Sequence, residues 1–343
     1  MQWPADGRVR PPRRRHHRAR RLKLISILTP CYNEEGNVVQ AYERVRQVMA
    51  GLPHYRYEHI FIDNCSKDRT LELLRSLAAA DRNVKVIANA RNFGVVRSGM
   101  HALYQSSGDA VIALVADMQD PPELIPLLIE KWEQGYSMVL CVKKSSQESR
   151  FMFFLRTLYY RVIRRLSTIE TFDNYTGFGL WDRQVVETIK SFEDPYPYVR
   201  GMIAEIGLPY FIVEYEQAAR KRGKSSYNLY ALYDLAMLGI TKLSKVPLRF
   251  VTFTGFLASF MCVVIGLSYL VYKLLYWDRF TLGLAPLVIG VFFFASVQLL
   301  SLGIIGEYIG TILTHVQKRP YVVERERINF DEEPVLVQSV KRS

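Results

Sequence analysis

The stretch ALVADMQDPPELIP, from Ala113 to Pro126, resembles a buried strand that ends in a polar turn before a helix. Its apolar residues give way to an acid, Asp117, then to an amide, Gln119, and then to a second acid, Asp120. Asp117 and Gln119 alternate along what we predict to be an extended segment, so both can face the same side at the strand end. Asp120 suits a structural role, because Asp-Pro-Pro-Glu is a typical helix start with a capping residue and early prolines.

The chain before this stretch alternates apolar strands with helical patterns. A strand, a helix and a second strand in this order predict parallel strands joined by crossover helices. We therefore expect an α/β fold with a mostly parallel, Rossmann-like sheet. Strands are predicted at residues 22–30, 57–64, 84–90 and 109–117, and helices at 37–51, 68–81 and 95–108.

Each predicted strand ends in a polar cluster. Sites on parallel sheets lie at the carboxyl ends of the strands, so these clusters should converge on one edge. The clusters are Thr29 to Glu34, Asp63 with Asn64, Asn89 to Asn92, and Asp117 to Gln119.

The apolar residues of this 343-residue chain gather near its C-terminus. Uncharged runs extend from Val251 to Tyr272 and from Phe280 to Gly306, and each exceeds the roughly 20 residues that cross a bilayer as a helix. Only a short segment containing Trp277 separates them, so the sequence predicts a transmembrane hairpin. The alternative is a pair of buried helices in a soluble domain.

Basic residues flank the predicted hairpin on both outer sides. By the positive-inside rule both termini and the α/β domain should face the cytosol, at a plasma (inner) membrane crossed by two helices. The flanking residues are Lys242, Lys245 and Arg249 before the first run, and Lys318, Arg319, Arg325 and Arg327 after the second.

The net charge of +12 comes largely from the N-terminal segment, where residues 1 to 23 hold nine Arg or Lys. We expect residues 1–22 to form a disordered basic tail, with attraction to anionic lipid as the functional alternative. No interleaved aromatic pattern accompanies the arginines, so nucleic-acid binding is not expected. Four scattered cysteines, without metal-ligand spacing, fit reduced thiols facing the cytosol.

The order of several motifs resembles a known family. The sequences TPCYNEE, FIDNCSKDRT, ARNFG and ADMQDPPE are followed by a basic RKRGKSSYN and two apolar runs. Together they resemble family 2 glycosyltransferases of the GT-A fold, and more narrowly the polyprenyl-phosphate glycosyltransferases. That group includes dolichyl-phosphate mannose synthases and bactoprenol glucosyltransferases. The resemblance extends from about Leu24 to Val323.

The resemblance implies a divalent cation, Mg²⁺ or Mn²⁺, at Asp117 and Gln119. Oxygen ligands suit these ions, which can stabilise the charge that grows on a leaving diphosphate. Family members usually read Asp-x-Asp-x-Gln here, whereas this chain has Val115 at the first position. The missing acid would help to position the donor, so its loss affects the donor's identity and the rate.

The resemblance also places the nucleotide-sugar donor over the first strand ends. It implicates Pro30, Tyr32, Glu34 and Asp63 in binding the base and ribose. Asn64 stands where the family more often has a second Asp. Asn92, with its neighbour Arg91, would support the nucleotide loop or pack within it. Glu35 fits better as a helix-start charge than as a ligand.

Cations are expected to hold an acceptor phosphate against repulsion from the donor diphosphate. A phosphate monoester is largely dianionic at neutral pH, because its second pKa is about 6, so it needs a general base less than a hydroxyl does. The family's Arg-x-x-Gly-x-Ser-Lys-Tyr loop is matched by Arg220, Gly223, Ser225 and Tyr227, although Ser226 replaces its Lys. We assign catalytic roles to Asp117, Arg220 and Ser225, and the acceptor phosphate to Lys143, Arg156, Arg222 and Lys224.

A further departure lies in the sequence DNYTGFGLWD. Many relatives have Gly-Asp-Phe-Arg where this chain has Thr176 to Gly179, so Gly177 takes the place of their Asp. Neither Asp173 nor Asp182 occupies the matching position, and we name neither as a general base.

We expect amphipathic helices to lie at the membrane surface. The segment from Phe151 to Leu166 carries an apolar stripe with arginines beside it, which fits an interfacial helix or packing against the sheet.

The predicted organisation is a tail at 1–22, a GT-A domain at 23–228, a juxtamembrane helix at 229–246, a hairpin at 247–316 with helices at about 249–275 and 282–308, and a cytosolic C-terminal tail at 317–343.

The resemblance therefore implies an inverting transfer of a sugar from a UDP- or GDP-sugar to undecaprenyl or dolichyl phosphate. Expected partners are the donor, the lipid phosphate and the membrane, and a short hairpin is compatible with a homo-oligomer. One alternative is a non-catalytic protein that binds lipid phosphate. Another is a processive polysaccharide synthase, whose Gln-x-x-Arg-Trp signature is only partly matched from Gln217 to Lys221.

Overall fold

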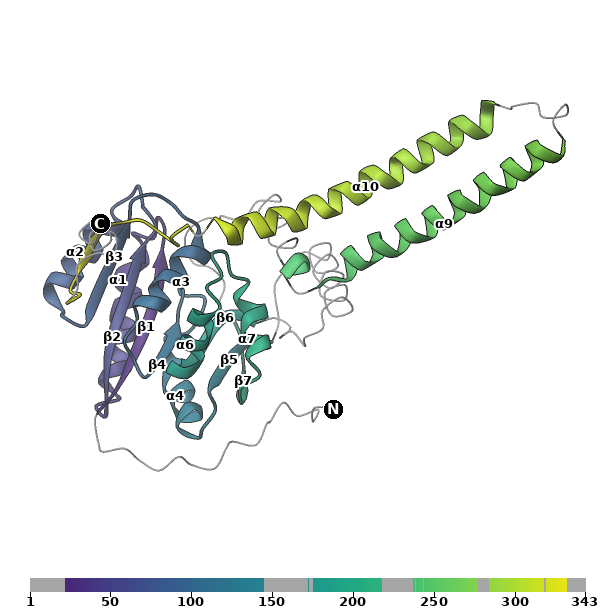
Figure 1. Cartoon of the computed structure of the whole chain (residues 1–343). Helices are drawn as coiled ribbons and strands as arrows, with labels where there is room; N and C mark the ends of the chain where they lie inside the picture. The colour runs from purple at the N-terminus through teal and green to yellow at the C-terminus, as the bar shows by residue number, and fades with distance from the viewer. Residues whose placement is uncertain are drawn as a thin grey trace, which may run out of the picture. The chain divides into compact units, whose positions relative to one another are not determined.

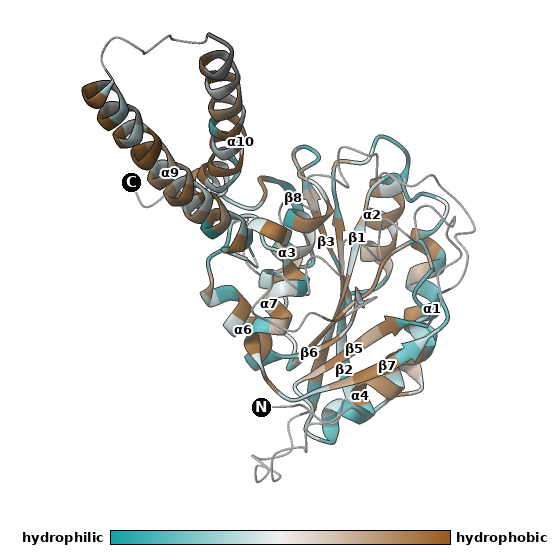
Figure 2. Cartoon of the chain, turned by 90° about the vertical axis from the view of Figure 1, so that its right-hand side faces the viewer, coloured by the Kyte–Doolittle hydropathy of each residue, from teal (hydrophilic) through white to brown (hydrophobic). Residues whose placement is uncertain are grey.

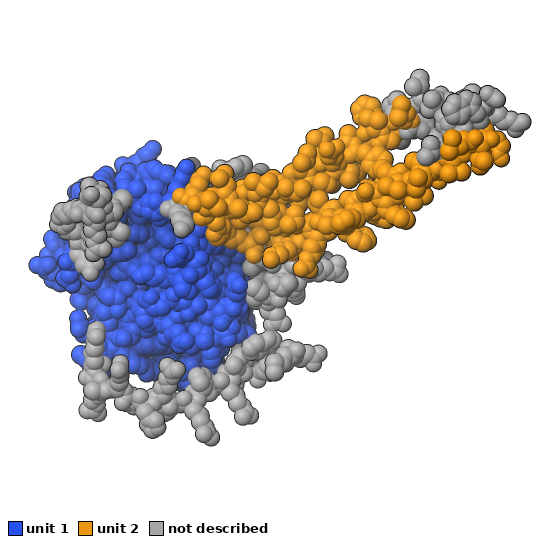
Figure 3. Space-filling model, viewed as in Figure 1, with its two compact units in different colours: residues 1–157, 170–227, 318–343 blue, residues 158–169, 228–317 orange. Residues whose placement is uncertain are grey.

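The computed structural model describes residues 22–144, 172, 175–217, 237, 239–242, 244–276, 284–317 and 319–331. The chain divides into two compact units, which Figure 3 colours separately. The first comprises Met1–Thr157, Glu170–Tyr227 and Lys318–Ser343, and the second Leu158–Ile169 and Asn228–Gln317. We describe each unit by itself.

Within the described residues, the first unit contains one eight-stranded sheet with the strand order β7-β5-β6-β4-β1-β2-β3-β8 (Figure 1). The strands β4, β1, β2 and β3 are parallel to one another, and β5 is parallel to β7. The prediction of a mostly parallel α/β sheet is therefore confirmed. The strands are β1 (Lys23–Cys31), β2 (Tyr55–Asp63), β3 (Val84–Asn89), β4 (Ala110–Ala113), β5 (Met138–Lys143), β6 (Tyr175–Asp182), β7 (Tyr210–Tyr215) and β8 (Glu324–Ile328).

Helices cover both faces of this sheet (Figure 1). Apolar side chains of α1 (Val38–Ala50), α2 (Thr70–Ala80) and α4 (Ile125–Glu133) fill the core on one face, and the short helix η1 (Pro122–Leu124) leads into α4. On the other face the core is completed by α3 (Val95–Gln105), α6 (Arg183–Ser191) and α7 (Val199–Ile206). Each helix buries one apolar stripe, as expected for a three-layer α/β domain.

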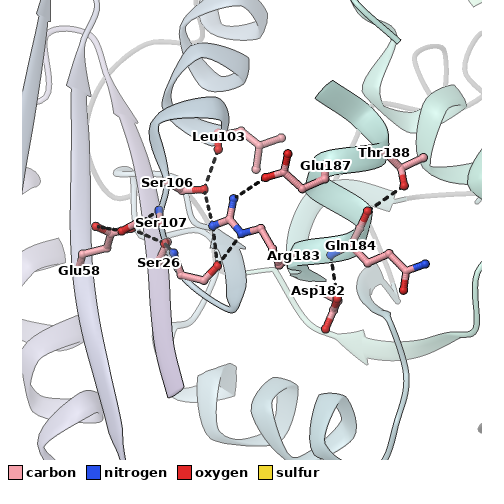
Figure 4. Close-up of polar contacts among 11 residues, drawn as sticks. Ser26, Glu58, Leu103, Ser106, Ser107, Asp182, Arg183, Gln184, Glu187 and Thr188 are labelled. Atoms are coloured by element: carbon pink, nitrogen blue, oxygen red, sulfur yellow. Dashed lines mark hydrogen bonds and ion pairs between the residues drawn. The ribbon is translucent and has the colours of Figure 1, made fainter. Parts of the chain in front are cut away.

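A polar network fastens the start of β4 at the end of the sheet remote from the strand carboxyl ends (Figure 4). The carboxylate of Glu58 accepts hydrogen bonds from Ser26 and from the backbone and hydroxyl of Ser107. Arg183, at the start of α6, donates to the carbonyl of Gly108. Burial alone would raise the pKa of Glu58, but hydrogen bonds from Lys85, Ser26 and Ser107 outweigh burial and hold this pKa below its ordinary value.

The C-terminal segment differs from the predicted tail, because residues 319–331 pack on the α/β unit and supply β8. This strand runs antiparallel to β3 and forms an edge of the sheet. Its sequence, ERERI, lacks the apolar alternation that would have revealed a strand. Its charges are satisfied locally instead, since Glu324 pairs with both His101 and Arg327 and all three side chains are largely buried.

The second unit is dominated by two long apolar helices, α9 (Val246–Leu275) and α10 (Leu284–Val316). Figure 2 shows hydrophobic residues along both helices. Their apolar windows, Val246–Ser268 and Gly290–Val316, have mean hydropathies of 2.2 and 1.6 and are not buried within the structure. Water is a poor solvent for such surfaces, so these helices suggest membrane association.

The helix α10 continues beyond the predicted end near residue 308. The ionisable residue Glu307 follows the apolar run from Phe280 to Gly306, but a single such residue does not break a helix. The last turns of α10 bind the segment before α9: Tyr308 donates to the carbonyl of Ser244 at 2.6 Å. Most of the predicted juxtamembrane helix at 229–246 lies outside the described residues, although residues 239–242 are helical.

Candidate active site

The candidate site lies at the carboxyl ends of β1, β2, β3 and β4. In the register of the sheet Cys31 pairs with Asp63, Asp63 with Ala88, and Leu28 with Ala113. The predicted polar clusters therefore do converge on one edge. The strand order reverses between β1 and β4, and such a switch point is where open α/β sheets bind ligands.

The Asp117 segment is a turn rather than the extended strand that we expected. The strand β4 ends at Ala113, and Met118 has a left-handed φ of 61°. The Oδ1 atom of Asp117 accepts a hydrogen bond from the backbone N–H of Gln119 at 3.2 Å. Asp117 and Gln119 thus stay close to each other, but through a local side-chain turn and not through strand alternation.

Asp120 does not cap the following helix, so that prediction is wrong. No side chain caps η1, and the Asp120 side chain is buried instead. Its carboxylate accepts hydrogen bonds from the hydroxyl of Tyr215 and, at 3.4 Å, from the amide of Gln217. The pKa of Asp120 is raised above its ordinary value, chiefly because the carboxyl group is buried. The two hydrogen bonds and the positive charge of Lys143 oppose this rise, whereas the negative charge of Asp117 adds to it.

This arrangement joins two parts of the candidate site that the sequence left separate. Tyr215 is the last residue of β7, and Gln217 lies two residues beyond it, just before the predicted acceptor-phosphate loop. Asp120 therefore connects the turn after β4 to the start of that loop. We did not predict this role from the sequence. The partial match from Gln217 to Lys221 was the signal that could have directed attention to Gln217.

The loops after β1 and β2 are held together by reciprocal hydrogen bonds. The backbone N–H of Asn33 donates to the Ser66 hydroxyl at 2.9 Å, and the Asn33 side chain accepts from the N–H of Lys67 at 2.8 Å. The N–H of Glu34 donates to the Thr70 hydroxyl at 2.8 Å. The loop after β1 carries the predicted donor residues Tyr32 and Glu34, and Pro30 lies just before it in β1, so the bonds fix the predicted nucleotide side of the site.

Glu35 belongs to the same set of loop contacts. Its Oε2 atom accepts from the N–H of Arg69, the residue that precedes α2, at 3.0 Å. This agrees with the helix-start role that we favoured, although the helix concerned is α2 and not its own.

Asp63 ends β2 and is fully buried. Its carboxylate accepts from the N–H of Ser66 at 3.2 Å. Burial raises the pKa of Asp63, while Ser66 and the positive charge of Arg325 lower it. Burial raises the pKa of the Cys31 thiol, and the negative charges of Asp63, Glu34 and Asp68 raise it further, which favours the protonated thiol at neutral pH.

Asn64 and Asn92 organise the loop that follows β3. The amide of Asn64 donates to Oδ1 of Asn92 at 2.8 Å, and its own Oδ1 accepts from the N–H of Phe93 at 2.8 Å and from the Ser98 hydroxyl at 2.9 Å. These bonds occupy the side-chain amide of Asn64. Direct contacts of Asn64 and Asn92 with the nucleotide-sugar donor stay a prediction. Their hydrogen bonds within the loop are observed in the structure.

The acceptor side is only partly described. Lys143 ends β5 at the same edge of the sheet as Asp117, and its charge acts on Asp120. The predicted residues Arg156, Arg220, Arg222, Lys224 and Ser225 lie outside the described residues, as does the interfacial helix expected at 151–166.

Two glycines shape the start of β6 beside this edge. Gly177 has a φ of 100°, and a Cβ atom added there would meet nothing within 4 Å. At Gly179 an added Cβ would lie 2.3 Å from the carbonyl oxygen of Val139, so close approach of β5 requires glycine. Asp182 lies at the opposite end of β6, where it caps α6, and is therefore remote from the candidate site.

The described residues suit a divalent cation held by few protein ligands. Within them no three His, Cys, Asp or Glu side chains are grouped as a metal site. However, Asp117 lies near enough to Asp120 for its charge to raise the pKa of Asp120, and a cation would relieve this repulsion. One carboxylate and one amide oxygen, completed by donor phosphates and water, match the coordination that Mg²⁺ favours.

Comparison with known proteins defines the class. Residues 26–190 match the family model described as Glycosyl transferase family 2. The chain is 34% identical over 303 residues to the SfII prophage-derived bactoprenol glucosyl transferase of Shigella flexneri, covering 88% of this chain and 97% of that protein. It is 35% identical over 310 residues to the uncharacterized glycosyltransferase YkcC of Bacillus subtilis, covering 88% and 93%. The chain belongs to glycosyl transferase family 2, and it is a glycosyltransferase.

More distant similarity extends to solved structures. The crystal structure of glucosyl-3-phosphoglycerate synthase from Mycobacterium tuberculosis in complex with phosphoglyceric acid aligns with a TM-score of 0.44 at 19% identity. That alignment covers 64% of this chain and 79% of that one.

Proposed function

We propose that this protein transfers a sugar from a nucleotide-sugar donor, a UDP- or GDP-sugar, to a polyprenyl phosphate such as undecaprenyl or dolichyl phosphate. The main support for this proposal is the similarity of the chain to relatives named bactoprenol glucosyl transferases, which extends over almost the whole length of those relatives. Two structural features support the same reaction. The polar residues at the switch point of the sheet would form a donor site, and the two long apolar helices would give access to a lipid.

The residues divide into a donor side and an acceptor side. On the donor side, the ends of β1 and β2 and the bonded loops after them would hold the base and ribose through Pro30, Tyr32, Glu34 and Asp63. On the acceptor side, Lys143 would attract the lipid phosphate, with Arg156, Arg220, Arg222, Lys224 and Ser225 completing the site. Asp120 joins the turn that carries Asp117 to Tyr215 and Gln217, and would hold this turn against the start of the acceptor loop.

A divalent cation, Mg²⁺ or Mn²⁺, would be held by Asp117 and Gln119, where it would neutralise charge that develops on the leaving diphosphate. The chain's own part is to keep the Asp117 carboxylate directed by the Gln119 N–H and to orient both substrates. An oxygen of the lipid phosphate attacks C1 of the sugar, the bond from C1 to the diphosphate breaks, and the configuration at C1 inverts. The phosphate is already anionic at neutral pH, so Gly177 in place of a family Asp leaves this step possible.

The proposed location is the inner face of a plasma membrane. The two apolar helices would form a hairpin, and the basic residues on its outer sides would keep the α/β unit and both termini in the cytosol.

The direct test is sugar transfer by the purified full-length chain in detergent. A panel of radiolabelled UDP- and GDP-sugars is offered with undecaprenyl phosphate, with Mg²⁺ or Mn²⁺ and then with chelator. We expect an acid-labile glycolipid from one donor, dependent on the ion and lost in Asp117→Ala. The matched control is Glu43→Ala, an exposed acid on α1, which should retain activity. Absence of product with every donor, from a folded chain, would refute the proposal.

A further inference from the structure

Three arginines, Arg91, Arg97 and Arg319, lie close together in the α/β unit, and of these only Arg91 has a predicted role, in the nucleotide loop. Arg97 lies in the first turn of α3, and its guanidinium donates to the carbonyls of Tyr321 at 2.8 Å and Pro320 at 2.7 Å. Those two residues follow Arg319 directly. Arg97 therefore fastens the segment that carries Arg319 to the start of α3.

The aromatic ring of Phe93 contacts both Arg91 and Arg97. The guanidinium carbon of Arg91 lies 4.1 Å from the centroid of the Phe93 ring, and that of Arg97 lies 5.2 Å from it. Cations are attracted to an aromatic face at such distances. The loop after β3 thus positions Arg91 beside Arg97.

The cluster has no acidic counterpart in the described part of the chain. None of the three arginines forms an ion pair with a carboxylate there. Burial lowers the pKa of Arg97, and the positive charges of Arg91 and Arg319 lower it further, partly opposed by Tyr196. The two carbonyl bonds use only part of the five N–H donors of the Arg97 guanidinium. Like charges assembled in this way favour an anionic ligand.

Covalent connection limits the distance of Arg319 from the last residue of an apolar helix. The apolar window of α10 ends at Val316, and Arg319 is three residues later. Three residues span at most about 11 Å even when fully extended. If α10 crosses the bilayer, Arg319 must lie near its headgroup layer, where lipid phosphates are the abundant anions.

We propose that Arg91, Arg97 and Arg319 bind the phosphate groups of anionic membrane phospholipids. The contact would fasten the loop after β3, which contains Asn92, to the bilayer surface. This inference rests on the membrane location in the proposed function, but it does not depend on sugar transfer.

The test uses the full-length chain in nanodiscs of phosphatidylcholine, with or without phosphatidylglycerol. Amide hydrogen exchange is followed in peptides covering residues 89–97 and 319–323. Each basic residue at an anionic surface contributes on the order of a fivefold factor in affinity. We therefore expect phosphatidylglycerol to slow exchange in these peptides by about fivefold or more, and 1 M salt to remove the effect by screening.

The informative variant is the double substitution Arg91→Gln/Arg319→Gln, because both side chains are exposed and their loss leaves the core intact. It should abolish the lipid effect. Arg56→Gln is the matched control, since Arg56 is an exposed arginine near the opposite end of β2, and it should retain the effect. Equal protection in the double variant, or no effect of phosphatidylglycerol on the wild-type chain, would overturn the inference.

Soluble anions distinguish a binding site for lipid phosphates from a binding site for the nucleotide-sugar donor. Inorganic phosphate or UDP, added to neutral nanodiscs, should not reproduce the protection; if either does so fully, the cluster binds a soluble ligand and the inference is wrong. Sugar transfer is measured in the same nanodiscs. Transfer without a lipid effect would refute only the lipid site, and a lipid effect without transfer would refute only the proposed reaction.

Discussion

His59 should make the α/β unit lose stability as the pH falls below neutrality. This residue lies in β2 and is fully buried, with Nε2 2.9 Å from the Thr29 hydroxyl and Nδ1 without a hydrogen-bond partner. Burial lowers the pKa of His59 to about 3. Protonation would place a charge in the core beside the Phe61 ring, where no described carboxylate pairs with it.

The sign and size follow from linkage. Between the folded pKa of about 3 and the unfolded value of about 6.5, the unfolded chain binds more protons, so stability falls as the pH falls. The His59 contribution lost is about 2 kcal/mol from pH 7 to pH 5 and about 3 kcal/mol by pH 4.

The assay is urea unfolding of the full-length chain in detergent, followed by tryptophan fluorescence at several pH values. The buried residues Trp132 and Trp181 report on the α/β unit. His59→Gln removes the titrating ring. Between pH 7 and pH 4 the variant should therefore lose about 3 kcal/mol less unfolding free energy than the wild type. His54→Gln replaces an exposed histidine and should keep the wild-type dependence. If His59→Gln and wild type lose equal stability, the reasoning is refuted.

Four further substitutions test the candidate site. Asn64→Asp removes the donor to the loop after β3 and should cost about 1–3 kcal/mol locally, seen as faster amide exchange in that loop. Tyr215→Phe leaves the Asp120 carboxylate short of a donor, so the melting temperature should fall by an amount corresponding to about 1–3 kcal/mol; an unchanged value would contradict this role. Gly179→Ala should prevent recovery of folded protein through its clash with β5, whereas Gly177→Ala should fold with a cost of about 1–2 kcal/mol, as compared by thermal melting.

The parallel core of the sheet could be predicted from the sequence because each of its strands is a buried apolar run between helical patterns. That periodicity also placed the polar strand ends on one edge. It failed for β8, whose five residues are mostly charged. The stability of β8 comes from its pairing with β3 and from the buried ion pair of Glu324 with His101, which are contacts between distant parts of the chain. The pair of Glu324 with Arg327 within the strand adds a local contact.

The candidate site shows the same division between local and long-range causes. The residue types of Asp117 and Gln119 were visible in the sequence, but their geometry was not, because the left-handed φ of Met118 converts an apparent strand into a turn. The role of Asp120 was hidden further, since local signals favoured a helix cap. Its partners Tyr215 and Gln217 come from almost one hundred residues later in the chain.

The buried position of Asp120 therefore bears on function as well as on stability. A carboxylate taken out of water is costly unless hydrogen bonds compensate it, and an apolar residue would fill the same place without that cost. Asp120 joins the turn that carries Asp117 to β7 and to the segment leading into the predicted acceptor-phosphate loop. A displacement of either side would weaken its hydrogen bonds. We therefore expect this acid to hold the turn that carries Asp117 at a fixed distance from the predicted acceptor loop, as a single displacement between two bound substrates requires.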